Sequence, residues 1–373
     1  MPGLYMHIPF CAAKCAYCDF LSFAGREDCA DKYIEALTAE IESYKPHYAG
    51  ASVESVFFGG GTPTLLDAAL LAKLLQKAAH VFAIAPGAEI TVEANPETID
   101  YDKLRALRTA GFNRISFGVQ SFDDVLLRRL GRIHSAETAE RAIINARQAG
   151  FDNINLDLMF GLPGQSMADW RRALSCAIDL DPEHVSCYSL ILEDNTPMQR
   201  ENPQDLPDEE EERAMYAHAR EKLALMGYVQ YEISNFAKPG FASRHNSMYW
   251  TGGDYIGFGL GAHSLLDNRR VCNTDDFTQY LHGDYGREVL ETLSVADRRA
   301  EFMILGLRMT AGVSITEFQK RFGRSIDRVF GTEVEGLTRE GLLVQEGDFL
   351  RLTECGVDIS NRVFTRFLDG GGN

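Results

Sequence analysis

Short apolar runs alternate with longer amphipathic stretches through the first half of the chain. The apolar runs, which predict β-strands, fall at 4–9, 55–58, 89–93, 114–119, 153–160 and 184–192. The amphipathic stretches, which predict α-helices, fall at 31–44, 68–82, 101–110, 136–149 and 167–180. Apolar strands that alternate with helices are typical of a parallel sheet. The pattern therefore predicts an α/β fold, an open, partial (β/α)6 barrel whose functional residues lie at the carboxyl ends of the strands.

The alternation stops near residue 193, and the rest of the chain has a different pattern. An acidic run at 208–212 predicts the start of a helix that ends near Met226, and a glycine- and aromatic-rich segment follows. The last block predicts helices at 298–309, 314–322 and 326–338, then a hairpin formed by 342–345 and 349–352. Helices followed by a hairpin predict a small winged-helix-like domain. We therefore divide the chain into a partial barrel (1–200), a mixed α+β segment (201–290) and a C-terminal domain (291–373).

Composition and charge restrict the class of protein. The 373 residues carry a formal net charge of −17, which argues against a nucleic-acid partner. No apolar run reaches the roughly 20 residues that span a bilayer, so we expect no stable membrane insertion and leave peripheral association open. The first residues lack a basic segment ahead of their apolar run, and the eight cysteines do not form a disulfide-like pattern. These features predict a cytoplasmic protein.

Three closely spaced cysteines follow the first predicted strand. Cys11, Cys15 and Cys18 have the spacing C-x3-C-x2-C. A structural zinc ion and a protein-held [4Fe–4S] cluster both need four protein ligands. Three thiols without an obvious fourth therefore suggest an iron–sulfur cluster with one iron left for an exogenous ligand. The alternative is a zinc site completed by His7 or Cys29.

Polar residues recur where the predicted strands end. A glycine-rich turn at 59–63 follows the second strand, Glu93 ends the third, Gln120 ends the fourth, and Asp157 lies in the fifth. Each residue alone is more often a helix cap or a solvated side chain. Because the carboxyl ends of parallel strands meet at one edge of a sheet, their recurrence predicts one shared pocket.

A histidine beside two large aromatic residues is the main feature of the mixed segment. His245 precedes Tyr249 and Trp250, and His263 follows in a glycine-rich stretch. An imidazole near flat side chains could ligate a heme iron or cover a substrate ring. Without other context, a histidine packed among core aromatics is the more common arrangement.

The cysteine spacing, with the aromatic Tyr17 before the last cysteine, resembles the signature of the radical S-adenosylmethionine (SAM) superfamily. With the second half included, the chain resembles the oxygen-independent coproporphyrinogen III oxidase-like family of that superfamily. The resemblance implies that Cys11, Cys15 and Cys18 hold a [4Fe–4S] cluster. It implies SAM contacts at Tyr5, Tyr17, Gly61, Thr62, Glu93, Gln120, Arg132, Asp157 and Ile191, of which the last is the weakest assignment.

Two branches of this family differ at positions that this sequence contains. The oxidase branch has a fourth cysteine two residues after the third, where this chain has Phe20, and an aromatic–glutamine pair where it has Ser247 and Met248. The stretch His-Asn-x-x-Tyr-Trp at 245–250 instead resembles a motif of the heme chaperone branch. That branch implies heme as a further ligand, with His245, Tyr249, Trp250 and His263 as candidates, and hemoproteins such as respiratory enzymes as acceptors.

We therefore expect a cytosolic heme chaperone that binds SAM but lacks coproporphyrinogen oxidase activity. The alternative is an oxygen-independent coproporphyrinogen III dehydrogenase, a radical SAM enzyme that decarboxylates its substrate oxidatively. The sequence leaves open which residue ligates the heme iron, whether the attachment is covalent and whether SAM is cleaved.

Overall fold

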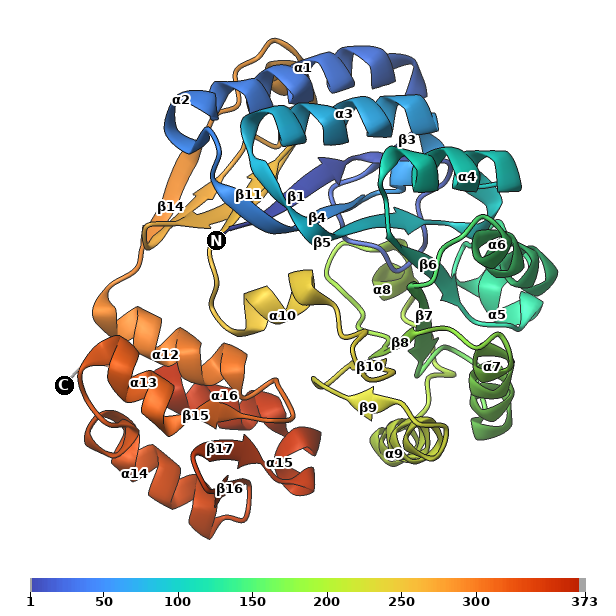
Figure 1. Cartoon of the computed structure of the whole chain (residues 1–373). Coiled ribbons are helices and arrows are strands. Elements are labelled where there is room, and N and C mark those ends of the chain that lie inside the picture. Colours follow the sequence, from blue (N-terminus) through green and yellow to red (C-terminus); the bar gives the residue numbers. More distant parts are fainter. Residues whose placement is uncertain (1, 369–373) are drawn as a thin grey trace.

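Six parallel strands form the centre of the molecule (Figure 1). The computed structural model describes residues 2–368; Met1 and the last five positions of the predicted C-terminal domain lie outside the described residues. The strands lie side by side in chain order: β1 (Gly3–Ile8), β4 (Ser52–Gly60), β5 (Ala83–Ala94), β6 (Arg114–Gln120), β7 (Ile154–Phe160) and β8 (His184–Ser189). Every neighbouring pair is parallel. The predicted β/α order is confirmed.

Helices cover the outer face of these strands, and the first four of them pack against one another in chain order (Figure 1). They are α1 (Ala30–Ser43), α3 (Ala68–Val81), α4 (Tyr101–Ala110), α6 (Ala136–Gln148) and α7 (Met167–Asp179), all within one or two residues of the predicted bounds. Helix α4 illustrates the local signals, since the Asp100 side chain caps its first turn and Gly111 ends it in the left-handed conformation at φ 111°. The short helix α5 (Asp124–Arg129) was not predicted because six residues give too short a periodic pattern.

The mixed segment extends this same sheet at both edges. On the β1 side, β11 (Tyr255–Phe258), β12 (His263–Leu266), β13 (Arg269–Cys272) and β14 (Glu288–Thr292) follow in order; on the β8 side lie β10 (Asn235–Ala237) and β9 (Val229–Gln230). Residues 201–290 therefore do not form a layer of their own, and their apolar side chains share the core of the barrel. The acidic run begins α9 (Glu209–Leu225) as predicted, with Asp208 in a capping box.

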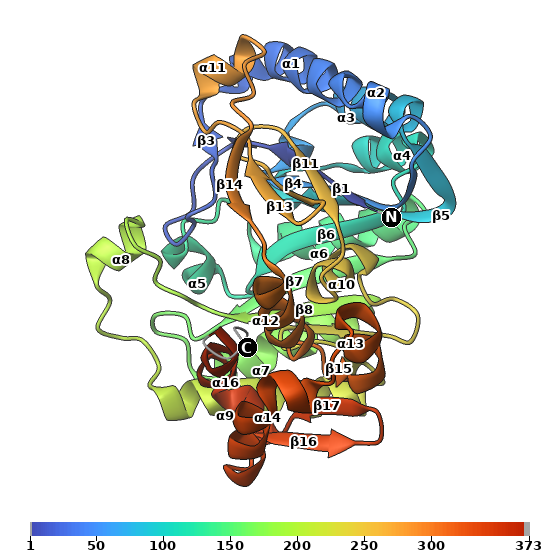
Figure 2. The same cartoon turned by 90° about the vertical axis from the view of Figure 1, so that its left-hand side faces the viewer.

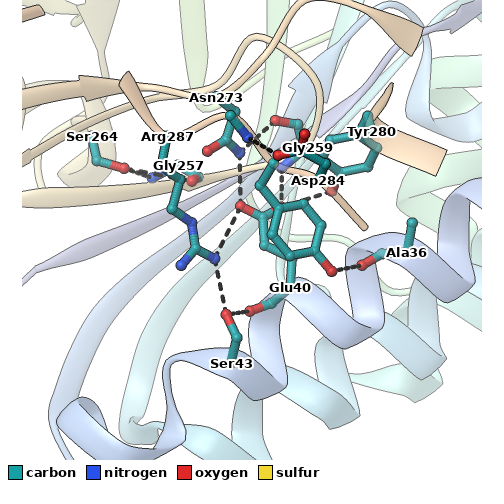
Figure 3. A network of polar contacts seen from close by, with 12 residues as sticks. Ala36, Glu40, Ser43, Gly257, Gly259, Ser264, Asn273, Tyr280, Asp284 and Arg287 are labelled. Atoms are coloured by element: carbon teal, nitrogen blue, oxygen red, sulfur yellow. Dashed lines mark hydrogen bonds and ion pairs between the residues drawn. The ribbon is translucent and has the colours of Figure 1, made fainter. Parts of the chain in front are cut away.

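A buried carboxylate joins helix α1 to the added strands (Figure 3). Glu40 is 0% exposed, and its oxygens accept hydrogen bonds from the Gly259 amide (2.8 Å), the Asn273 side-chain amide (2.7 Å) and the Tyr280 hydroxyl (2.7 Å). The Arg287 guanidinium lies 3.8 Å away. Burial raises the pKa of Glu40, although these partners oppose the shift. The network fixes the turn after β11 next to the end of β1.

The C-terminal part has a hydrophobic core of its own (Figures 1 and 2). Its helices are α12 (Val295–Gly306), α13 (Ile315–Phe322), α14 (Ile326–Arg339), α15 (Glu354–Asp358) and α16 (Ser360–Leu368). The predicted hairpin is present as β16 (Leu343–Glu346) and β17 (Phe349–Leu352), and β15 (Val313–Ser314) adds a third strand. Within the described part of the chain, no helix combines the length and apolar character needed to cross a membrane.

Replacing Glu40 with glutamine should destabilise the protein by about 2–4 kcal/mol. The glutamine NH2 group would face donors that now bond to a carboxylate oxygen, so at least one buried donor would lose its acceptor. Chemical denaturation would measure the free energy of unfolding. Glu42→Gln is the matched control, because Glu42 lies on the same helix and only makes ion pairs at the surface. Equal stability of Glu40→Gln and Glu42→Gln would contradict this role of the network.

Candidate functional site

The cysteine loop is held in place by backbone hydrogen bonds from both sides. It begins at β2 (Phe10–Cys11), directly after β1. From the end of β4, the amides of Gly61 and Thr62 donate to the carbonyls of Ile8 (2.8 Å) and Phe10 (2.7 Å). From the other side, the Ala16 amide donates to the Leu130 carbonyl at 3.0 Å. The loop conformation is therefore fixed by the barrel.

Gly61 allows the two segments to approach this closely. A β-carbon at this position would lie 2.6 Å from the Phe10 carbonyl oxygen and 3.0 Å from Cys11 Sγ. Side-chain atoms do not approach backbone oxygens to 2.6 Å, so every residue other than glycine would displace the loop. This gives the glycine-rich turn a definite role, as the wall against which the first cysteine lies.

Polar groups of the barrel surround the three thiols. The Thr62 hydroxyl lies 3.8 Å from Cys11 Sγ, and the Arg132 guanidinium donates to Cys15 Sγ at 3.4 Å. Burial raises the pKa of Cys11 and of Cys18. Coordination to iron stabilises thiolates against such a shift, and the arginine charge favours an anionic centre. The donor set therefore fits a [4Fe–4S] cluster.

The zinc alternative lacks its additional ligand in this arrangement. One ring nitrogen of His7 lies 2.8 Å from the Leu21 carbonyl oxygen, and the other lies 3.2 Å from the Tyr5 hydroxyl. Among residues 2–368, no three His, Cys, Asp or Glu side chains are placed to hold a single metal ion. His7 supports the turn next to the cluster loop and does not face the thiols.

A cavity of about 140 Å³ opens beside the cysteines at the carboxyl ends of the strands. We call it the mouth cavity. It is lined by all three cysteines and by seven of the nine residues predicted to contact SAM: Tyr17, Gly61, Thr62, Glu93, Gln120, Arg132 and Asp157. The strands β4 to β7 thus bring together residues from widely separated parts of the sequence, as the strand-end pattern predicts.

Two of these residues have restricted conformations. Arg132 donates to the Asn95 side-chain oxygen at 2.7 Å and to the Gly118 carbonyl, which keeps its guanidinium in the mouth cavity. Gln120 has a φ of 65°, a left-handed conformation that non-glycine residues seldom adopt. Such strain is typical of functional positions.

A second cavity of about 320 Å³ lies inside the barrel, next to the mouth cavity. We call it the lumen. It shares Tyr17, Phe20, Glu93, Ser116, Gln120 and Asp157 with the mouth cavity and adds Phe57, Arg114, Asn155, Met159, Ser186, Tyr188 and Asn246. Burial raises the pKa of Glu93 to about 8, with the neighbouring Asp157 adding to the shift, and burial also raises the pKa of Asp157.

The residues predicted from the strand ends do not include most of those that the lumen adds. The signal that would have found them is the two-residue alternation along each strand. One face of β6 carries Arg114, Ser116, Gly118 and Gln120. One face of β7 likewise carries Asn155, Asp157 and Met159. A strand buried on both faces of a parallel sheet is ordinarily apolar throughout. The polar face therefore indicates a functional interior.

Tyr5 and Ile191 do not line the mouth cavity. The Tyr5 ring stacks on Phe57, and its hydroxyl lies beside His7. Ile191 is 66% exposed and lines a separate groove of about 680 Å³ between the β8 edge, α9 and the C-terminal part. The SAM contacts expected at these two positions stay predictions.

The helix α10 (Arg244–Trp250) carries the histidine–aromatic motif and packs against β4 (Figure 1). His245 is 1% exposed, with Nδ1 3.0 Å from the Ser55 hydroxyl and Nε2 3.0 Å from the Tyr249 hydroxyl. Its ring stacks on Phe57, which lines the lumen. Burial lowers the pKa of His245 to about 3, so the imidazole is neutral. Both ring nitrogens are already hydrogen-bonded within the protein, which argues against His245 as the first candidate iron ligand and for a positioning role.

The other two heme candidates lie in different places. Trp250 lines the groove that contains Ile191, and the Arg308 guanidinium lies 4.4 Å from the centre of its ring. His263 is exposed at the start of β12, with its Nε2 3.4 Å from Cys272 Sγ. The four heme candidates therefore do not form one cluster. Of the two histidines among them, His263 is the exposed one.

Comparison with known proteins places the chain in a family. Its sequence matches the Radical SAM superfamily over residues 5–177 and the HemN C-terminal domain over residues 293–359. The heme chaperone HemW of Bacillus subtilis (strain 168) is 39% identical over 376 residues, covering 99% of each chain. The heme chaperone HemW of Escherichia coli (strain K12) is 37% identical and covers 98% of each. The chain belongs to the HemW family.

Among solved structures, coproporphyrinogen III oxidase (HemN) from Escherichia coli, described as a radical SAM enzyme, has the same fold. Its TM-score is 0.86 at 25% identity, covering 98% of this chain and 90% of that one. The predicted radical-SAM fold and family are therefore confirmed. The winged-helix-like part of this chain contains residues 293–359, which match the HemN C-terminal domain.

Replacing Gly61 with alanine should lower the cluster content of anaerobically reconstituted protein to well under half of the wild-type value. The added β-carbon would push the Phe10 carbonyl and Cys11 away from the barrel end. Iron and sulfide analysis and visible absorption measure the effect. Gly331→Ala is the matched control, because a β-carbon there meets no atom within 4 Å and the residue lies in α14. Wild-type iron content in Gly61→Ala would contradict the close approach.

Proposed function

We propose that this chain is a cytoplasmic heme chaperone, which binds a [4Fe–4S] cluster, SAM and heme and transfers the heme to hemoproteins such as respiratory enzymes. The observation that carries the proposal is its similarity to proteins named heme chaperone HemW over 98–99% of both chains. The cavities and the motif helix support it, because they provide two adjoining places, one for a cluster with SAM and one for a further ligand.

The residues of the mouth cavity would hold the first two cofactors. When bound, the reduced cluster supplies the electron for radical SAM chemistry. Three thiols leave one iron for SAM, and the backbone at Gly61 and Thr62 forms the adjacent wall. Glu93 and Asp157 line the same cavity as further SAM-pocket positions, and Arg132 stays next to Cys15. These assignments follow the family resemblance residue by residue.

The helix α10 is the part of the chain that we assign to heme binding. It contributes Asn246 to the lumen and Trp250 to the outer groove, while His245 and Tyr249 anchor it to β4 through Ser55. A histidine that positions this helix would affect heme binding without touching the iron. His245 would therefore change the affinity for heme while a different residue ligates the iron.

Oxidative decarboxylation of coproporphyrinogen III is the second candidate function. The likeness to the Escherichia coli oxidase in fold, together with a complete mouth cavity, favours it. Against it stands Phe20, which occupies the position of the fourth cysteine of the oxidase branch and is 63% exposed beside both cavities. Met248 packs next to Gly3 and Gly253 and does not line the lumen. These positions favour the chaperone.

Heme titration of the anaerobic protein should give saturable binding that His245→Ala and Tyr249→Phe both weaken. We expect a loss of about tenfold or more for His245→Ala, the size typical of residues that orient a metal site. The position of the Soret band should stay unchanged in both variants, because a positioning residue does not ligate the iron. Absorption spectroscopy measures affinity and band position together.

The same titration identifies the ligand if this assignment is wrong. A displaced Soret band in His245→Ala, with normal binding in Tyr249→Phe, would make His245 the iron ligand. His263→Ala tests the accessible imidazole in parallel. An absence of saturable heme binding by the wild-type protein would refute the chaperone proposal.

Reconstituted protein given reductant, SAM and coproporphyrinogen III should form no protoporphyrinogen above the background without protein. We expect this because the loop and motif positions that distinguish the oxidase branch are replaced. Chromatography of the oxidised porphyrins measures the product, and an oxidase of the HemN type is the positive control. Product formed in proportion to protein concentration would favour the enzyme over the chaperone.

A further inference from the structure

One arginine inside the barrel forms no hydrogen bond or ion pair within the described part of the chain. Arg114, the first residue of β6, is 2% exposed, and its guanidinium forms no hydrogen bond or ion pair with any residue from 2 to 368. Its Nε is fully buried, while the side chain contributes to the wall of the lumen. A guanidinium offers five N–H donors, and the one on Nε is buried here without an acceptor, which costs free energy. A ligand that supplies acceptor atoms would stabilise such a group.

A second unpaired polar atom lies next to it. Thr91 on β5 is paired in register with Arg114 on β6, so the two residues are side by side. The Thr91 hydroxyl is buried and also has no hydrogen-bond partner among the described residues. Two unsatisfied polar side chains at adjacent positions on neighbouring strands indicate a shared polar subsite.

The charges around the lumen favour an anion there. Arg114 is its one cationic lining residue among the described side chains, and the two acidic lining residues are Glu93 and Asp157. Burial raises the pKa of Glu93 to about 8, so this carboxyl group is mostly neutral at pH 7. His184 and His245 are neutral as well, because burial and the Arg114 charge both lower their pKa. The Arg114 charge attracts both Glu93 and Asp157 and opposes the rise of their pKa, yet neither carboxyl group forms a hydrogen bond or ion pair with the guanidinium within residues 2–368. Its N–H groups that face the lumen are therefore available to an anionic ligand.

We propose that Arg114 anchors a carboxylate of the ligand that enters the lumen, and that this ligand is the acidic arm of a tetrapyrrole. The inference rests on the proposed heme function. A volume of about 320 Å³ is at the lower end of the range for small-molecule pockets, so the lumen accepts an arm more readily than a whole macrocycle. Heme carries two propionate arms, and a planar guanidinium binds a carboxylate through two parallel hydrogen bonds. Asn246 brings the motif helix to the same cavity.

The test compares heme with its dimethyl ester, which keeps the iron and the ring and removes both negative charges. The wild-type protein should bind heme about 10- to 100-fold more tightly than the ester, the range expected for one charge-assisted contact. Arg114→Met should abolish this preference by weakening heme binding alone. Arg141→Met is the matched control, because Arg141 lies exposed on α6, and it should keep the wild-type preference.

Stability and SAM binding separate a ligand anchor from a structural residue. Because Arg114→Met removes an unpaired buried charge, the ligand-free variant should melt at the wild-type temperature or above it. SAM affinity should be unchanged, since the carboxylate of SAM is expected at the cluster. An equal loss of affinity for SAM would assign the Arg114 contact to SAM and overturn the tetrapyrrole proposal.

The remaining outcomes distinguish this inference from the function on which it rests. Saturable heme binding with equal affinity for the ester would show that water alone satisfies Arg114, and it would overturn the inference while the chaperone proposal stands. Equal weakening of heme and ester binding by Arg114→Met would indicate a structural effect and also overturn it. A wild-type protein that binds neither compound would refute both proposals.

Discussion

The cluster site depends on the direct contact between two backbone segments, the end of β4 and the start of the cysteine loop. Hydrogen bonds from Gly61 and Thr62 continue the pairing of β4 with β1 beyond the sheet and place Cys11 at the barrel mouth. The absence of a β-carbon at Gly61 makes this contact possible. Within the loop, Ala16 and Tyr17 pack against the hydrophobic cluster that contains Leu130 and Met159. The geometry of the loop is therefore supplied by the barrel, and the thiols are positioned before any cluster is bound.

The barrel interior contains buried polar side chains, whereas the rest of the core is apolar. The outer faces of the strands bury apolar side chains against the helices, as expected for an α/β protein. The inner faces carry Arg114, Glu93 and Asp157, whose burial costs free energy that neighbouring bonds offset only in part. Natural proteins keep such groups where they serve a ligand. The polar interior therefore lowers the stability of the ligand-free fold and provides groups that can bind a ligand.

Some elements of this fold have a clear signal in the sequence, and others do not. The six parallel strands were predictable because each is a short apolar run followed by a helix with recognisable ends, as at Gly111. Strands β13 and β14 were not, because they contain residues such as Arg270 and Glu291, which pair across the two strands, and so form no apolar run. The strand-end residues were predicted as a site because topology alone brings them together.

Other features depend on contacts that a sequence does not display. The bond between His245 and Ser55 joins residues 190 positions apart, so the motif could suggest an aromatic setting but not that both ring nitrogens were occupied. Ile191 follows the last barrel strand, yet the chain leaves the barrel there and the side chain faces the outer groove. Arg114 lies in a predicted strand, and the polar alternation on β6 indicates its inward face.

The spacing of the motif on α10 explains how one short helix serves two cavities. His245 and Tyr249 are four residues apart and occupy one face, which is fixed to β4 through Ser55. Asn246 and Trp250 are also four residues apart and occupy the adjacent face, where Asn246 reaches the lumen and Trp250 the groove. The guanidinium that covers Trp250 belongs to Arg308, which follows α12 of the C-terminal part. A ligand arm in the lumen would therefore touch a helix that also contacts the C-terminal part, so the two halves of the chain meet at this motif.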